Sequence, residues 1–182
     1  RNSNSSGAAS CARAVPAKLK DFFDERVVRS IAGDLVRVAP SLDERRFVRE
    51  GLDGLEKLEL IARGWHLAET LKRHLPAPFP EAAELLIRSL GPRHGSTDGL
   101  GMEPFRYLPH VFFVGKYGLD HLEAALQAQY ELTQRFTAEW SIRGFLVKYP
   151  EATYARLLQW TRDPNVHVRR LTSEGIRPRL AT

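Results

Sequence analysis

The stretch DPNVHVRRLTSEGIRPRL, residues 163–180, is typical of the second helix of a helical-hairpin repeat. Asp163 is suited to cap a helix that begins beyond Pro164, and Val168 stands where an apolar side chain would pack inward. The rest of the stretch carries four arginines around one acid, Glu174. The pattern therefore predicts a strongly basic helix that keeps a single carboxylate.

Glu174 belongs to a short sequence motif that occurs twice. TAEWSIRG begins at Thr137 and TSEGIRP begins at Thr172, so Glu139 and Glu174 lie 35 residues apart. A period of about 35 residues is typical of repeats made of two helices and a turn. Stacked hairpins of this kind form a solenoid in which corresponding residues face the same surface. The predicted fold class is all-α, an α-solenoid of HEAT-like helical repeats, in which a helix opening with Asp-Pro and continuing Val-Arg-Arg is frequent.

Apolar residues at steps of three and four predict helices along almost the whole chain after Pro16. Residues 105–118 are also predicted to be a helix, kinked at Pro109, because a lone strand would have no partner. Ser41 is expected to cap one helix and Pro150 to end another. The other predicted helices fall within residues 18–39, 41–75 (divided near Gly51 and Gly54), 79–91, 119–136, 137–149, 151–163 and 165–177.

Two segments fall outside this helical pattern. Residues 1–15 are rich in Ser, Ala, Asn and Gly and are predicted to be a disordered lead, with the repeat domain spanning 16–182. Residues 92–104 form a glycine-rich loop of a length that is often functional.

The excess positive charge is confined to the last quarter of the chain. Residues 135–182 hold nine Lys and Arg against four Asp and Glu, whereas the other 134 residues hold 18 of each. Such a concentration is expected of a polyanion-binding surface, although a solvated basic face would look the same. No apolar run approaches the ~20 residues that span a bilayer, and a single cysteine favours a cytoplasmic protein without disulfides.

The two repeated acids have a structural and a chemical interpretation. Glu174 could pair with Arg170 or Arg177, and Glu139 with Arg135 or Arg143, since these partners lie three or four residues away on a helix. A carboxylate beside a nucleic-acid backbone, however, repels phosphate. A protein that keeps one there could use it to stabilise a sugar cation or to orient water, as glycoside hydrolases do.

The chain from Lys18 to Leu180 resembles the AlkC family of bacterial alkylpurine DNA glycosylases, which is related to AlkD. The resemblance is carried by residues 18–35, 66–92, 117–146 and 160–180, and most specifically by the last of these, WTRDPNVHVRRLTSEGIRPRL. It implies a HEAT-like solenoid whose basic concave face grips duplex DNA. It further implies hydrolysis of the N-glycosidic bond of small cationic alkylated bases such as 3-methyladenine, without metal or cofactor, by a monomeric, cytoplasmic, nucleoid-associated enzyme.

The family's acidic active-site residues would fall on Glu139 and Glu174. Trp140 and Tyr107 are candidates for contact with the lesion or its sugar, although large aromatic side chains are more often part of the core. Candidates for contact with the DNA backbone, some of which could instead pack between repeats, are Arg143, His167, Arg169, Arg170, Arg177 and Arg179.

The chain departs from the family pattern at two places. Gly144 stands where the family has proline, and Ala181-Thr182 stand where the family has Pro-Trp. Further repeats, with at least one more acid, would normally follow, so we expect the solenoid to be truncated at its C-terminal end. A non-catalytic DNA-binding solenoid and a basic protein-interaction scaffold are therefore the competing interpretations.

Overall fold

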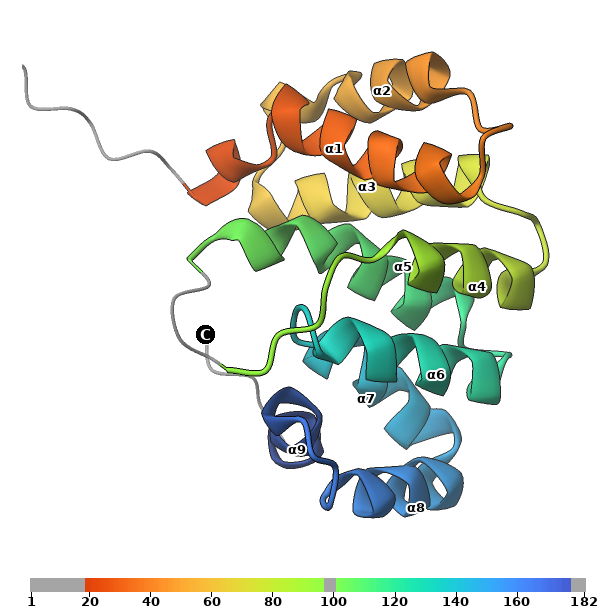
Figure 1. The fold of residues 1–182 in the computed structure, drawn as a ribbon, viewed down its shortest axis with the longest axis vertical. Helices are drawn as coiled ribbons and strands as arrows, with labels where there is room; N and C mark the ends of the chain where they lie inside the picture. Colours follow the sequence, from red (N-terminus) through yellow and green to blue (C-terminus); the bar gives the residue numbers. More distant parts are fainter. Residues whose placement is uncertain (1–18, 97–100, 178–182) are drawn as a thin grey trace, which may run out of the picture.

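The computed structural model describes residues 19–96 and 101–177, and every regular element within them is helical (Figure 1). The predicted disordered lead and Arg179 lie outside these ranges. Three short 3-10 helices, Leu19–Phe22, Leu55–Lys57 and Glu103–Tyr107, accompany the α-helices. The α-helices are α1 (Glu25–Val38), α2 (Glu44–Leu52), α3 (Leu60–His74), α4 (Phe79–Ser89), α5 (Leu108–Tyr117), α6 (Leu122–Thr133), α7 (Glu139–Lys148), α8 (Pro150–Trp160) and α9 (Val166–Glu174).

The helices stack in two layers, which confirms the predicted helical-repeat class. Helices α1, α4 and α6 follow one another in one layer, and α3, α5 and α7 in the other (Figure 1). Helix α2 packs against α1 and α3, α8 packs against α7, and α9 packs against α6 and α8. The chain thus alternates between layers from α4 to α7, as stacked hairpins require.

Glycines allow the helices of the second layer to approach closely. A Cβ added at Gly64 of α3 would lie 2.8 Å from the Phe112 ring of α5, and one added at Gly115 of α5 would lie 3.1 Å from Cα of Ser141 in α7. Buried Phe, Leu, Val and Ala side chains fill the space between the layers from α1 to α7. A smaller apolar cluster, which includes Ile142, Leu157 and Val168, joins α6 and α7 to α8 and α9.

Several predicted helix ends are shifted in the structure. Asp43, not Ser41, caps α2, because its side chain accepts the hydrogen bond from the Arg46 backbone amide. Gly54, in the left-handed conformation at φ 70°, separates α2 from α3 as predicted.

The expected role of Pro109 is wrong, whereas that of Pro150 is confirmed. Pro109 lies in the first turn of α5, where a missing amide donor costs nothing, so it begins the helix rather than kinking it. Helix α7 ends at Lys148, just before Pro150 as predicted, and the same proline begins α8. Helix α9 ends at Glu174, before the predicted stop at Pro178.

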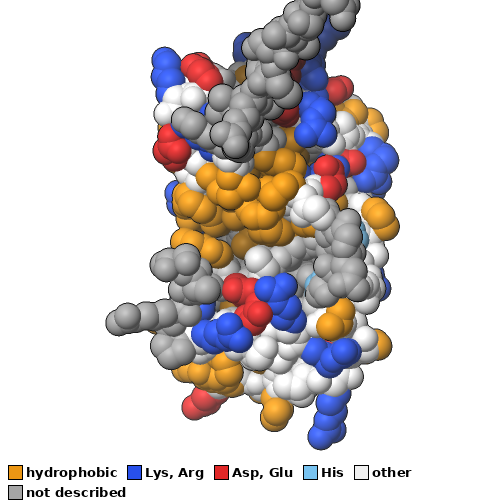
Figure 2. Space-filling model, turned by 90° about the vertical axis from the view of Figure 1, so that its left-hand side faces the viewer, with side chains coloured by type: hydrophobic (Ala, Val, Ile, Leu, Met, Phe, Trp, Pro, Cys, Tyr) orange, Lys and Arg blue, Asp and Glu red, His pale blue; other side chains and the backbone are white. Residues whose placement is uncertain are grey.

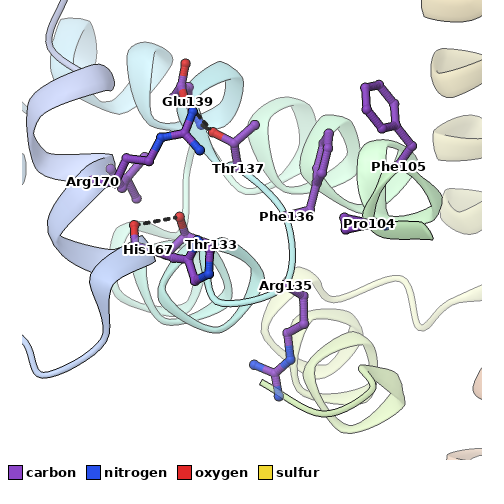
Figure 3. A pocket seen from close by; sticks show the side chains of 10 residues that line it. Pro104, Phe105, Thr133, Arg135, Phe136, Thr137, Glu139, His167 and Arg170 are labelled. Atoms are coloured by element: carbon purple, nitrogen blue, oxygen red, sulfur yellow. Dashed lines mark hydrogen bonds and ion pairs between the residues drawn. The ribbon is translucent and has the colours of Figure 1, made fainter. Parts of the chain in front are cut away.

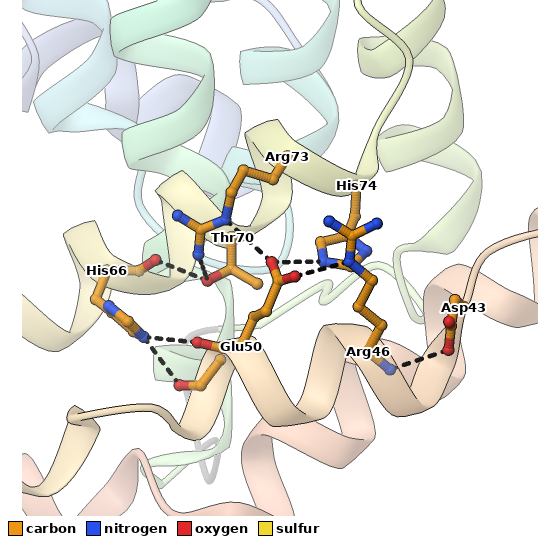
Figure 4. A network of polar contacts seen from close by, with 8 residues as sticks. Asp43, Arg46, Glu50, His66, Thr70, Arg73 and His74 are labelled. Carbon is orange, nitrogen blue, oxygen red and sulfur yellow. Dashed lines mark hydrogen bonds and ion pairs between the residues drawn. The ribbon is translucent and has the colours of Figure 1, made fainter.

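A carboxylate-centred network fastens α2 to α3 (Figure 4). Glu50 of α2 accepts hydrogen bonds from Arg46 Nε at 2.8 Å and Arg73 Nε at 3.1 Å, and it lies 3.1 Å from His74 Nε2. Hydrogen bonds from Arg46 and then from His74 lower the pKa of Glu50 to about 2. The Glu50 carboxylate that joins α2 to α3 is therefore ionised throughout the neutral pH range.

The segment 91–96 ties the middle of the chain to its C-terminal helices. It runs from the end of α4 alongside α6 toward α9 (Figure 1). Glu131, which is buried on α6, binds Arg93 Nη2 at 2.8 Å and Arg135 Nη1 at 2.7 Å. Farther along, the carbonyl of His94 accepts a 2.9 Å hydrogen bond from Asn165 Nδ2, at the start of α9.

None of the helices within the described ranges is long and apolar enough to cross a membrane.

Candidate active site

The two repeated acids meet at one arginine. Glu139 is the first residue of α7 and Glu174 is the last residue of α9. Arg170 Nη2 lies 2.8 Å from Oε2 of Glu174 and 3.9 Å from Oε1 of Glu139. The side chains of Glu139 and Glu174 are only 15% and 19% exposed. Two partly desolvated carboxylates thus flank a single guanidinium.

Thr137 fixes the orientation of Glu139. Its hydroxyl donates a 2.7 Å hydrogen bond to Oε1 of Glu139 and accepts one of 3.3 Å from the Glu139 backbone amide. The helix cap position itself falls on Ala138, although the Thr137 hydroxyl still satisfies an amide of the first turn. The carboxylate is therefore held against its own helix terminus.

The two carboxylates have different affinities for a proton. Burial and then a hydrogen bond with Glu174 raise the pKa of Glu139, although the Thr137 hydroxyl partly opposes this rise. A hydrogen bond from Arg170, followed by one from Glu139, lowers the pKa of Glu174. Environments that push the pKa values of two neighbouring acids apart divide them into a proton acceptor and a fixed anion.

Glu139 opens into a cavity of about 300 Å³, which we call the carboxylate cavity (Figure 3). Arg170, Thr137 and His167 line it near Glu139. Phe105 and Phe136, whose ring centres lie 5.3 Å apart, line the opposite side. The cavity thus places an aromatic surface opposite a carboxylate.

Sequence reasoning did not single out this aromatic pair. Phe136 directly precedes Thr137, the first residue of the repeated motif, so its position in the sequence already placed it near Glu139. Phe105 comes from the 3-10 helix Glu103–Tyr107, and no spacing in the sequence relates it to Glu139.

The predicted DNA-contacting arginines have different environments. Arg170 lines the cavity, whereas Arg169 Nη1 donates to the carbonyls of Asp163 and Pro164 at 2.7 and 2.9 Å. Arg169 therefore closes the turn between α8 and α9. Arg177 is exposed just beyond α9.

Arg143 lies one turn beyond Glu139 on α7 and is half-buried. Its Nε and Nη2 atoms are buried and have no hydrogen-bond partner among the described residues. Its donors are therefore available to a bound anion once the side chain moves.

His167 is held between α9 and the segment 91–96. Its backbone amide donates to Oδ1 of Asn165 at 2.9 Å, and its Nε2 lies 3.0 Å from the carbonyl oxygen of Ser96. Asn165, not Asp163 as predicted, is thus the cap of α9. Asp163 instead accepts hydrogen bonds from the Asn165 amide and the Tyr130 hydroxyl, both at 2.8 Å.

The two aromatic candidates do not line the carboxylate cavity. Tyr107 is buried, and its hydroxyl accepts a 3.1 Å hydrogen bond from the Gly91 amide. Its packing and its hydrogen bond both give it a structural role, and its expected contact with the lesion or the sugar stays a prediction. Trp140 is 48% exposed, but it faces a second hollow together with Trp65 and Phe112.

The face shown in Figure 2 joins apolar and charged surface. A broad hydrophobic area lies directly above a group of acidic and basic side chains. Within residues 19–96 and 101–177, no three His, Cys, Asp or Glu side chains gather as a metal site would require.

The protein is thus an all-α helical-repeat protein with a candidate hydrolytic site. In this site Glu139 and Glu174 lie on either side of Arg170. Its structure is similar to that of Pseudomonas fluorescens alkylpurine DNA glycosylase AlkC bound to DNA containing an abasic site analog, with a TM-score of 0.75 and 31% identity. That match covers 92% of this chain and 44% of the other. The chain is therefore similar to this alkylpurine DNA glycosylase in both sequence and fold.

A second relative is the uncharacterized protein YhaZ of Bacillus subtilis, which is 32% identical over 165 residues, 90% of this chain and 44% of YhaZ. No protein-family model matches the chain. The chain spans less than half the length of both relatives.

Proposed function

We propose that the protein is a DNA repair glycosylase that hydrolyses the N-glycosidic bond of small cationic alkylated bases, such as 3-methyladenine, in duplex DNA. The observation that carries the proposal is the convergence of Glu139 and Glu174 on Arg170 beside the carboxylate cavity. The structural similarity supports the same reaction, since the similar solved structure is an alkylpurine DNA glycosylase bound to DNA.

The pKa values of Glu139 and Glu174 are shifted in opposite directions, which matches two requirements of this reaction: a fixed negative charge and a proton acceptor. When the C1′–N bond breaks, its electron pair neutralises the positively charged base and leaves an oxocarbenium-like sugar. Glu174, whose pKa Arg170 holds low, supplies a fixed negative charge that stabilises this cation. Glu139, whose pKa burial raises, accepts the proton of the water that adds to C1′. A cationic base is already a good leaving group, so these roles need no metal or other cofactor.

Double-stranded DNA would be held by cations around this site. Arg170 and His167 line the carboxylate cavity, Arg143 has unmet donors, and Arg177 is exposed next to Glu174. Arg179, predicted to contribute as well, lies outside the described residues. We do not assign Arg169 to DNA, because its guanidinium already binds two carbonyls.

The test is release of 3-methyladenine from methylated duplex DNA by the 182-residue chain. The Glu139→Gln/Glu174→Gln double variant is assayed alongside, with salt-dependent DNA binding measured for both proteins. Release by the wild-type chain alone supports the glycosylase and its two acids. Equal release by both proteins would overturn the assignment of the acids.

Salt-sensitive binding without release would instead favour a DNA-binding repeat protein that lacks catalysis. A chain that neither binds DNA nor releases base would overturn both functions.

A further inference from the structure

A second concave site lies on the flank of α7, outside the carboxylate cavity. It has a volume of about 270 Å³ and lies between α3, α5 and α7. We call it the aromatic hollow; Trp65, Phe112, Lys116 and Trp140 line it together with Gly115 and Gly144. Nothing in the proposed reaction at Glu139 uses these side chains.

The rings of the aromatic hollow are arranged as a stacking surface. Trp65 and Phe112 lie parallel, with ring centres 4.3 Å apart and planes 13° apart. Trp140 meets Phe112 edge-on at 5.7 Å and 68°, which leaves the tryptophan 48% exposed. An exposed tryptophan braced by other rings is well placed to stack on a flat ligand. Nucleobases of every kind stack on such side chains.

The aromatic hollow is directly joined to the candidate active site. Trp140 follows Glu139 in the first turn of α7, and neighbouring Cα atoms are about 3.8 Å apart. Successive side chains on a helix point about 100° apart. One therefore faces the carboxylate cavity and the other faces the aromatic hollow. A DNA strand whose sugar reaches Glu139 brings its neighbouring nucleotides to Trp140.

One cation beside the rings, Lys116, and a second on the next turn of α7, Arg143, favour a ligand that also carries a phosphate. The Lys116 ammonium lies 5.9 Å from the centre of the Trp65 ring, and a 2.6 Å ion pair with Glu69 holds it at this rim. Arg143 lies three residues after Trp140, on the same face of α7. Its buried Nε and Nη2 atoms have no hydrogen-bond partner within the described ranges. A rotated Arg143 side chain would satisfy these donors on a phosphate oxygen.

We propose that the aromatic hollow takes an unpaired base of the bound DNA, next to the nucleotide at Glu139. In this complex the base stacks on Trp140 and Arg143 binds its phosphate. The inference rests on the proposed function only in that the protein must bind DNA; it does not require base release.

The experiment compares three DNA duplexes by fluorescence anisotropy: a fully paired duplex, a duplex with one bulged nucleotide, and one whose bulged nucleotide lacks its base. Because stacking on an aromatic side chain typically changes affinity at least fivefold, the wild-type chain should bind the bulge with a base about tenfold more tightly than the baseless bulge. Trp140→Ala should remove this preference, and Trp140→Phe should retain most of it. Tyr154→Ala, which truncates a 53% exposed aromatic side chain on α8, is the matched control and should leave the preference unchanged.

The outcomes separate this inference from the proposed function. Salt-sensitive DNA binding with no preference for the base, or a preference that survives Trp140→Ala, would overturn the inference alone. A wild-type chain that binds none of the three duplexes would overturn the inference and the proposed function together. Glu139→Gln should abolish base release while keeping the preference, because the aromatic hollow does not include that carboxylate.

Discussion

The Thr137 hydroxyl donates a 2.7 Å hydrogen bond to the Glu139 carboxylate and also accepts one from the Glu139 amide. The same hydroxyl therefore positions the carboxylate and favours its ionised form. It opposes the rise in pKa that burial and Glu174 produce.

Replacing Thr137 by valine should raise the pKa of Glu139 further, because the hydrogen bond to its ionised form is lost. The acidic limb of the pH profile of kcat/KM should move to higher pH, and kcat should fall about tenfold, as expected for a lost hydrogen bond to a charged group. The profile is measured on methylated duplex DNA. Thr137→Ser, which keeps the hydroxyl, should restore both values; a profile that stays in place in Thr137→Val would contradict the positioning role.

Single substitutions of the two acids should separate catalysis from binding. Glu139→Gln should lower base release by about 100-fold or more, the usual effect of removing a general base. Glu174→Gln should lower it too, because the stabilising charge is removed. DNA binding should be kept or become tighter, since each variant loses a charge that repels phosphate. Loss of DNA binding in both variants would refute this assignment.

Arg169 and Arg170 are adjacent, and the structure predicts opposite phenotypes for them. Arg170→Ala should reduce the slope of log K against log salt by about 0.9, as expected when one phosphate contact is lost. Arg169→Ala should leave the slope unchanged and lower stability by about 1 kcal/mol, because its hydrogen bonds close the α8–α9 turn. Salt titrations and thermal unfolding of both variants measure these effects. Equal salt slopes in the two variants would disprove the distinction.

Glu50 should make stability depend on pH in the acid range. Its folded pKa of about 2 lies below its ordinary value of 4.5. Its contribution to stability is therefore fully present above pH 4.5 and is lost as pH falls toward 2. The Tm of Glu50→Gln should be lower than that of the wild type at pH 7, and the two should converge on acidification. The exposed Glu84→Gln serves as control; an unchanged difference in Tm between pH 7 and pH 3 would argue against the Glu50 network.

The sequence predicted the helical-repeat architecture because apolar spacing and prolines act locally. It also predicted that Glu139 and Glu174 would face one region, since corresponding residues of neighbouring repeats share a surface. It could not predict that Arg170 would bridge them, because Arg170 and Arg177 are both spaced to pair with Glu174. Tyr107 and Trp140 lie outside the carboxylate cavity for a related reason: the sequence does not show which side of a helix an aromatic side chain occupies.

The contacts of segment 91–96 had no sequence signal at all. Glu131 and Arg93 are 38 residues apart, and Asn165 and His94 are 71 apart. Such pairs depend on the path of an irregular segment, which no periodicity describes. The position of Phe105 in the carboxylate cavity could not be predicted for the same reason.

Segment 91–96 also constrains how this protein could have changed during evolution. Repeat proteins commonly gain or lose whole hairpins, because each unit touches only its neighbours. Here the contacts of His94 and Ser96 with Asn165 and His167 skip over the hairpin formed by α5 and α6 as well as α7 and α8. Duplicating or deleting a unit between them would leave the segment too short or too long to reach α9. We therefore expect the number of repeats between α4 and α9 to stay constant.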